Sequence, residues 1–581
     1  MQNARRIYLY LLSAVGLTVA AVGLWNLLTL AFERISGQLG GSVIGTISEA
    51  DTRSQLSLAL ALVAVAGPLW AIHWWFVGRG VRSPVTGEAE RTAPIRAFYL
   101  ALVELVGLGL VLLNGSAVVT DAIRGAIGRP AEFGGAPEGP FAAVLVAAGI
   151  WVFHASTRRD DERAGPLEGP ADWWPRLAWY ALVAGALVML CSGATELIRT
   201  LLDLAVGRSS ILGETDPWLA PVAGSFAGIL VGGGAWLGLW LGLDRRLRSP
   251  GWIGPSERAS AVRKAFLAGG IVVGAATTLL AVGSGLAVAM AWLLGAAEST
   301  DGARAFQDSV GPPIAIVPFT LVWWWSRRRL LAEGPWAWPR DGAVAARRLS
   351  GYASAAVGLA FAAVGAGWLV GFVVDVVLGG ERTIIAGSDA WHREVATYLA
   401  YVLVGTPVWL WSWIGATRRW AAMPGLEAAA TQRRVYLYLV LAAALIASIS
   451  ALALVVYRLF GIVLGATQPS NIVSELSTPV GVIVVGAMIV AYHGLALRTD
   501  LALREMEPAA TPAPAPTWAT AIPVPDTPAT VSLAGSAVEL SVVVVGPPGA
   551  DPDEVLATLR AALPTGYGIR PTEAGSEATP D

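Results

Sequence analysis

The chain has 581 residues, of which 55% are hydrophobic and only 14% are charged, and its net charge is −2. Soluble domains carry about 25% charged residues, so this composition excludes an ordinary soluble fold. Cys191 is the only cysteine, which excludes an intramolecular disulfide, and four histidines leave little material for a metal site.

Long apolar runs follow one another along most of the chain. The first covers residues 7–32, and others cover 177–197, 265–294, 349–378 and 435–464. Each can cross a hydrocarbon layer about 30 Å thick at about 1.5 Å per residue. The first run is too long for a cleaved signal and lacks a small-residue cleavage site. The sequence therefore predicts an all-α polytopic membrane protein held in a lipid bilayer.

One sequence repeat of 80 to 90 residues occurs six times along the chain. Each copy begins with a basic residue, followed four positions later by tyrosine in four copies. Each ends with a helix in which Trp or His stands five residues before an arginine. The copies begin at Arg6, Arg96, Arg176, Lys264, Arg348 and Arg434, and the aromatic positions are Trp74, His154, Trp240, Trp323, Trp413 and His493. This periodicity predicts six tandem helical hairpins, about twelve transmembrane helices, with those six aromatic residues at equivalent depth.

The predicted boundaries follow from the repeat and from the change in composition after it. A Pro/Ala-rich linker separates the last hairpin from a small α+β C-terminal segment of β-α-β type, which has a strand at Val538–Val545 and a helix capped near Asp551. About forty residues are too few for an independent core, so this cytoplasmic segment is expected to dock on the membrane domain, on a second copy of the chain or on a cytoplasmic protein partner. The hairpins are placed at 1–90, 91–170, 171–255, 256–341, 342–428 and 429–505, the linker at 506–530, the C-terminal segment at 531–571 and a disordered tail at 572–581.

The basic residues are distributed unevenly between the two ends of the hairpins. The hairpin starts and ends carry 28 Lys and Arg residues, whereas the connections inside the hairpins carry ten. By the positive-inside rule, both termini are predicted to be cytoplasmic, in a bacterial cytoplasmic membrane. Small residues at four-residue spacing predict close packing of the first helices. Pro68, Pro318 and Pro407 predict local kinks in the second helices.

Glu104 is an acid inside an otherwise apolar span. It lies eight residues after Arg96, roughly 12 Å into the helix, where the sister copies have small or apolar residues. An intramembrane acid is a functional hypothesis, and His73 and His154 are the candidate partners at similar depth. The preferred alternative is a structural Glu104 with one neutral hydrogen-bond acceptor. Both interpretations require the side chain to point into the helix bundle and not toward lipid.

The sequence offers little material for other chemistry. His154 and His493 occupy a position that is Trp in four sister copies, which favours an interfacial side chain over a haem or metal ligand. The stretch "VVVVGPPG" lacks the Gly-Lys-Ser/Thr of a phosphate loop. We therefore expect no catalytic, cofactor-binding or metal-binding residues and no nucleic-acid partner.

Several quoted stretches resemble a known family. "RRIYLYLL", "RRVYLYLV", "GPLWAIHWWFVGR" and "GTPVWLWSWIGATRR" look like the bacterial membrane domain of unknown function catalogued as family 5671 (DUF5671-like). The resemblance covers roughly residues 5–503 as repeated copies and is looser in the second to fourth. It implies a membrane location and transfers no functional residue.

Two functions remain open from the sequence. One is a non-enzymatic scaffold, assembly or sensory component, indicated by the scarcity of buried polar residues and by the separate C-terminal segment. The other is a transporter or channel built from parallel hairpin repeats. A polar cavity near the midplane and a discontinuous helix would favour the second, whereas a dry interior would exclude it.

Overall fold

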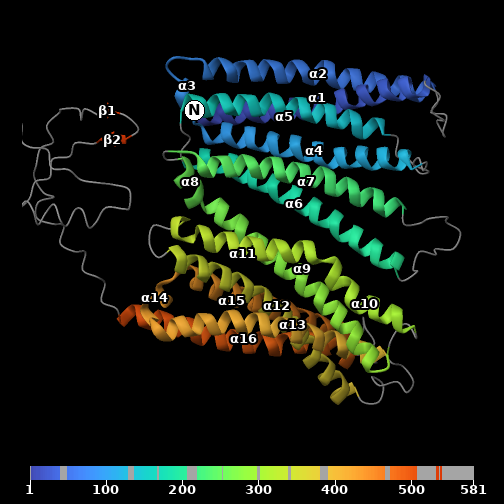
Figure 1. Ribbon diagram of the computed structural model, residues 1–581, viewed down its shortest axis with the longest axis vertical. Helices are drawn as coiled ribbons and strands as arrows, with labels where there is room; N and C mark the ends of the chain where they lie inside the picture. The colour runs from blue at the N-terminus through green and yellow to red at the C-terminus, as the bar shows by residue number, and fades with distance from the viewer. Residues whose placement is uncertain are drawn as a thin grey trace, which may run out of the picture. The chain divides into compact units, whose positions relative to one another are not determined.

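The protein is described here from a computed structural model (Figure 1). It describes residues 2–38, 49–127, 137–165, 169–205, 219–250, 253–296, 301–337, 342–379, 390–464, 472–506, 532–534 and 537–539. The described residues fall into a helical unit, within residues 1–507, and a separate C-terminal unit, within 508–581.

The helical unit consists of helices that pack in sequential pairs. Figure 1 shows these pairs stacked in an open row that follows the order of the chain, with α2 at one end and α16 at the other. Eleven of the described helices are long and apolar enough to span a membrane, so the protein is an all-α polytopic membrane protein. The pairs are α1 (Gln2–Gln38) with α2 (Glu49–Val81), α4 (Pro94–Ala126) with α5 (Glu138–Ala164), α6 (Pro170–Ala205) with α7 (Leu219–Arg248), α9 (Ala261–Leu293) with α10 (Gly302–Ala315) and α11 (Val317–Ala337), α12 (Gly342–Gly379) with α13 (Ala390–Ala422), and α15 (Thr431–Val463) with α16 (Ile472–Met506).

Three short helices group the hairpins two by two. They are α3 (Gly87–Arg91), α8 (Ile253–Ala259) and α14 (Pro424–Ala429), and each joins the first hairpin of a group to the second. We call the groups units 1, 2 and 3. All three short helices lie on the same side of the row, at one end of the long helices, which we call the linker end, and the opposite ends of the long helices form the loop end (Figure 1).

Glycines allow the paired helices to approach closely, as the small-residue spacing predicts. A Cβ atom on Gly358 of α12 would lie 2.5 Å from the amide nitrogen of Trp409 on α13. Seven residues later, a Cβ on Gly365 would lie 2.6 Å from the carbonyl oxygen of Tyr398. Both distances are below van der Waals contact, so only glycine permits this backbone separation.

The second helix of the fourth hairpin is interrupted. α10 ends at Ala315 and α11 begins at Val317, with Pro312 and Pro313 before the break and Pro318 just after it. Proline lacks an N–H donor and disrupts the helical ladder, which explains the interruption. The break agrees with the kink expected at Pro318. It also divides the eighth of the twelve predicted spans, so α11 is absent from the eleven candidate spans among the described helices.

The C-terminal unit contains one described strand pair. β1 (Ser532–Ala534) pairs antiparallel with β2 (Ala537–Glu539), and Leu533 lies opposite Val538. The predicted strand at Val538–Val545 overlaps β2 only at its first two residues, and β1 was not anticipated. The rest of that strand, the predicted helix and the 572–581 tail lie outside the described residues, as does the 506–530 linker after Met506.

Candidate functional site: a charged cluster repeated three times

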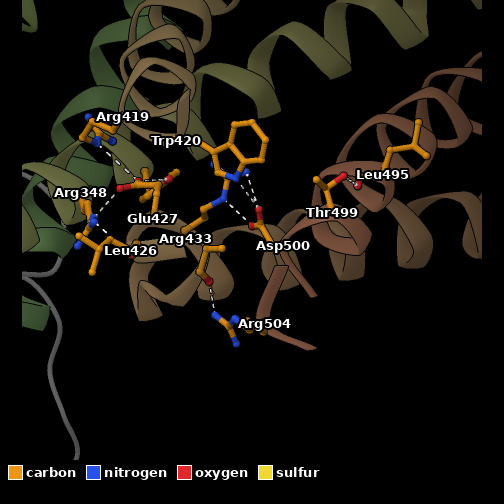
Figure 2. Close-up of polar contacts among 12 residues, drawn as sticks. Arg348, Arg419, Trp420, Leu426, Glu427, Arg433, Leu495, Thr499, Asp500 and Arg504 are labelled. Atoms are coloured by element: carbon orange, nitrogen blue, oxygen red, sulfur yellow. Dashed lines mark hydrogen bonds and ion pairs between the residues drawn. The ribbon is translucent and has the colours of Figure 1, made fainter. Parts of the chain in front are cut away.

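A buried ion pair joins two helices at the linker end of unit 3. Arg433, near the start of α15, donates from Nε and Nη2 to the two carboxylate oxygens of Asp500 on α16, at 2.6 and 3.3 Å. The indole Nε1 of Trp420 on α13 donates to the same carboxylate at 3.0 Å (Figure 2). The guanidinium also lies over the ring of Trp413, 5.6 Å from its centroid. One acid therefore ties three helices together.

A second buried acid ties the short helix to the same unit. Glu427 on α14 is 1% exposed and accepts from Arg348 Nε of α12 at 2.7 Å and from the Tyr352 hydroxyl at 2.8 Å. Arg419 of α13 lies 3.6 Å from the same carboxylate, and Figure 2 shows the two side chains facing each other. The short helix is therefore held by hydrogen bonds from α12 and by an ion-pair contact from α13.

Units 1 and 2 contain the same arrangement. In unit 1, Arg96 donates to Asp161 at 2.7 and 3.2 Å, and in unit 2, Arg263 donates to Glu333 at 2.7 and 2.6 Å. We call each set of six residues a linker-end cluster. The clusters are Arg6, Tyr10, Trp74, Glu90, Arg96 and Asp161; Arg176, Tyr180, Trp240, Glu257, Arg263 and Glu333; and Arg348, Tyr352, Trp413, Glu427, Arg433 and Asp500.

The charges of these clusters are paired with one another. The side chains of Arg96 and Asp161 are 4% and 7% exposed, and those of Arg433 and Asp500 are 4% and 2% exposed. A buried charge is tolerated only when it is paired and hydrogen-bonded. Carboxylates held by bidentate arginines are poor proton donors and acceptors, so this arrangement suits a structural lock better than acid–base catalysis.

The clusters correct the register of the repeat. Tyr10 of "RRIYLYLL" is buried and Tyr8 is exposed, whereas in "RRVYLYLV" the earlier tyrosine, Tyr436, is buried and Tyr438 is exposed. The two phrases therefore bury opposite tyrosines, because one begins a first hairpin and the other a second hairpin. The counterparts of Arg96 are consequently Arg263 and Arg433, one residue before the predicted starts Lys264 and Arg434.

The aromatic positions at the helix ends also separate into two classes. Trp74, Trp240 and Trp413, on the first hairpins, each lie under the cluster arginine. His154 and His493 stand seven residues before the cluster acid and face the hydroxyls of Tyr99 and Tyr436 at 3.3 and 3.4 Å. The same two positions in unit 2 hold Phe266, which lacks the phenolic hydroxyl, and Ser326, which lacks the imidazole. Trp323 is therefore not the counterpart of His154.

The tyrosine–histidine contact of unit 1 is expected to contribute to the free energy of unfolding. Tyr99→Phe should lower the free energy of unfolding by about 0.5–1.5 kcal/mol, the net value of one hydrogen bond. In the background of His154→Ser the same change should have a smaller effect, because the partner is already absent. Equilibrium unfolding in mixed micelles measures both. Equal effects in the two backgrounds would show that the contact contributes nothing.

The residues proposed from the sequence as an intramembrane polar site do not form one contact group. Glu104 is 6% exposed and points into the helix bundle, as expected. Among the described residues its partner is a cation, since Arg158 Nε of α5 donates to it at 2.7 Å. His73 bonds through Nδ1 to the carbonyl of Leu69, and His154 meets Tyr99. The expected neutral acceptor for Glu104 is therefore wrong, because a neighbouring helix supplies an arginine.

The Glu104–Arg158 pair is specific to unit 1. Counted from the cluster residues, Glu104 corresponds to Ile271 and Arg158 to Leu330 in unit 2. Ile271 and Leu330 are both buried in one apolar cluster. Unit 1 thus has an ion pair where unit 2 has two packed aliphatic side chains. Arg158 is also 2.5 Å from Glu162, which joins the pair to the linker-end surface.

Comparison with known proteins gives one family. The family described as Domain of unknown function (DUF5671) matches the chain at residues 6–150, 176–322 and 348–488. These three segments begin at Arg6, Arg176 and Arg348 and each lies within one of the three units. No curated protein and no solved structure matches the chain.

Proposed function

This chain belongs to the DUF5671 family of membrane domains of unknown function, and from that premise we propose that it is a non-enzymatic membrane scaffold, assembly or sensory component. The observation that supports this proposal is the linker-end cluster, which occurs once in each unit. Each cluster links four long helices and a short one through paired charges and through a tryptophan that packs against the cluster arginine. Such a pairing favours one fixed arrangement of hairpins, which is what a platform for other proteins requires.

The proposed rigidity can be measured directly. Val85 and Met423 are 89% and 60% exposed at the linker end of units 1 and 3, and each can carry a spin label in a Cys191→Ser background. We expect a single narrow distance distribution from electron–electron double resonance in nanodiscs, because the clusters hold the hairpins within each unit, and contacts of α4 with α6 and of α9 with α13 join successive units. A broad or two-peaked distribution would contradict a rigid scaffold.

The proposed orientation places the linker end and both termini in the cytoplasm of a bacterial cell, because the basic residues gather there. In intact cells, a membrane-impermeant maleimide should label Phe306→Cys, at an exposed loop-end position, and leave Val85→Cys unlabelled. After permeabilisation, both should react. The opposite pattern would invert the topology. Both variants are made in a Cys191→Ser background.

We also propose that the C-terminal unit binds a cytoplasmic protein. Its support is that residues 508–581 form a unit separate from the helices, and that a Pro/Ala-rich segment begins this unit. Cross-linking from expressing cells should give one or more defined proteins with the full chain that are lost from a variant ending at Glu507. Identical cross-linked proteins from the two chains would contradict the proposal.

A transporter or channel is the second candidate, and one observation favours it. The break between α10 and α11 adjoins a pocket whose mainly apolar lining includes Arg199, Asp203 and Asp308, and discontinuous helices of this kind line substrate sites in many transporters. Spin labels at Phe306 on α10 and Val377 on α12, both exposed, report on the loop end. Two interconverting distances there, beside one fixed distance at the linker end, would favour transport over scaffolding.

A further inference from the structure

A pocket of about 500 Å³ lies between α1, α4 and α5 in unit 1. Along α4 it extends from Leu102 to Asn114, twelve residues and roughly 18 Å. Along α1 it extends from Ala14 to Trp25, roughly 16 Å, and it stops eight residues short of Arg6 in the linker-end cluster. Half of a hydrocarbon core measures about 15 Å. The pocket therefore spans the loop-end leaflet of the bilayer and reaches slightly beyond the midplane.

The pocket opens to the lipid-facing surface of the helices. Val22, Val106 and Leu110 belong to its lining, and all three side chains are exposed. Each lies inside a candidate membrane span, where the surroundings of an exposed side chain are hydrocarbon. A molecule that enters the pocket from this side comes from the bilayer, so the expected occupant is a lipid.

In unit 3, glycines bring the equivalent helices, α12 and α16, into contact. A Cβ atom on Gly481 of α16 would lie 2.6 Å from the amide nitrogen of Gly371 on α12, below van der Waals contact. Counted from the cluster residues, Gly371 corresponds to Thr29 of unit 1, and Gly481 corresponds to Ala142. The side chains of Thr29 and Ala142 keep α1 and α5 further apart, which leaves room for the pocket.

A tryptophan fixes this wider separation. Trp25 of α1 corresponds to Gly367 of unit 3, and its Nε1 donates to the carbonyl oxygen of Gly139, near the start of α5, at 2.9 Å. An indole with its N–H bonded near the membrane boundary is in a favourable place. The ring bridges α1 and α5 at the loop end and forms the outer boundary of the pocket. Side chains specific to unit 1 therefore hold the pocket open.

Asn114 gives the lining a neutral hydrogen-bond acceptor at the loop end. None of the described residues that line the pocket is charged. Asn114 Nδ2 donates to the carbonyl oxygen of Leu110 in its own helix, at 2.9 Å. Its Oδ1 is accessible and accepts no hydrogen bond from the residues that the structure describes. A phosphate or carboxylate head group would find no cation in this lining, whereas a hydroxyl group can donate to Asn114 Oδ1.

We propose that this pocket binds an uncharged membrane lipid that carries a hydroxyl group. Its hydrocarbon chain would lie along α1 and α4, and its hydroxyl would donate to Asn114 Oδ1 near the membrane boundary. The length of the pocket matches one chain of a leaflet. Units 2 and 3 have Ala281 and Ala451 where unit 1 has Asn114, so the site is specific to unit 1. It is independent of the scaffold proposal, because it uses no residue of the linker-end clusters.

Photo-cross-linking of the full chain in phosphatidylcholine nanodiscs tests the proposal. Three probes share a hexadecyl chain with a central diazirine and differ only at the end, which is an alcohol, its methyl ether or its phosphocholine ester. Peptide mass spectrometry measures labelling of the pocket lining relative to labelling around Val65, an exposed residue of α2. The alcohol should label the lining at least about threefold more than either other probe, because only the alcohol can donate to Asn114.

Asn114→Ala is the matched variant, because units 2 and 3 already have alanine at this position. It should abolish the preference for the alcohol and leave labelling by the ether unchanged. Ala21→Phe, which fills the pocket, should lower labelling of the lining by all three probes at least about threefold. Val106→Trp serves the same purpose if Ala21→Phe fails to fold. Equal labelling by alcohol and ether, stronger labelling by the phosphocholine probe, or an alcohol preference that survives Asn114→Ala would overturn the proposal.

Discussion

Replacing Arg158 with leucine is expected to destabilise the helical unit by about 3–5 kcal/mol, whereas Arg158→Leu combined with Glu104→Ile should recover most of the loss. The single change leaves the buried Glu104 side chain without its cation. Removing one partner of a buried ion pair is strongly destabilising, but replacing both by packed apolar residues is often neutral or stabilising. Unit 2 already holds isoleucine and leucine at the equivalent positions, 271 and 330.

Unfolding in mixed micelles, followed by tryptophan fluorescence, gives the four free energies of this double-mutant cycle. Glu104→Ile alone should have a smaller effect than Arg158→Leu, because Arg158 keeps Glu162 at 2.5 Å. A double variant that is less stable than Arg158→Leu alone would refute the equivalence between the two units. It would also return Glu104 to the list of functional candidates.

Asp500→Ala is expected to lower the free energy of unfolding by about 3–5 kcal/mol, since it removes the acceptor of two buried donors. Arg433, 4% exposed, loses both of its bonds to the carboxylate, and Trp420 Nε1 loses its acceptor. Asp500→Glu should restore most of the stability, because unit 2 uses Glu333 in the same role. The same unfolding measurement compares the two substitutions.

Asp160→Ala is the matched control for this prediction. Asp160 pairs with Arg163 at 2.9 Å, but the two side chains are 72% and 77% exposed. An exposed pair contributes about 0–1 kcal/mol, so this variant should remain close to the unmodified protein. Equal effects of Asp500→Ala and Asp160→Ala on the free energy of unfolding would show that the linker-end clusters do not stabilise the helical unit.

The membrane class and the paired helices were predictable from the sequence because each depends on local composition. The apolar runs determine the spans, and the recurrent basic starts mark where hairpins begin. The correspondence between residues of different hairpins was harder to predict. Because "RRIYLYLL" and "RRVYLYLV" match letter for letter at most positions, their alignment placed Tyr438 with Tyr10, whereas packing buries Tyr436. A phrase with tyrosines two residues apart can bury either one, depending on the neighbouring helix.

The sequence does contain a pattern that marks the clusters, but a count of charges does not reveal it. In all three units a glutamate precedes the cluster arginine by six residues: Glu90 and Arg96, Glu257 and Arg263, Glu427 and Arg433. In a sequence, acids near a membrane surface cannot be told from solvated residues. Only the tertiary contacts show that these three glutamates are cluster residues. Glu104 was found because it differed from its sister copies, but Arg158 lies in the polar run "TRRDDER" and was not distinguishable from its neighbours.

The open row of hairpins has a consequence for how such a protein can grow or shrink. A closed ring fixes the number of its members, because adding one changes every angle. An open row has no such constraint, so its length depends only on how many units the gene encodes. Each linker-end cluster is completed within its own unit, between Arg6 and Asp161 in the first case. A duplication or deletion of a whole four-helix period would therefore leave every remaining cluster complete, whereas gain or loss of a single hairpin would divide one.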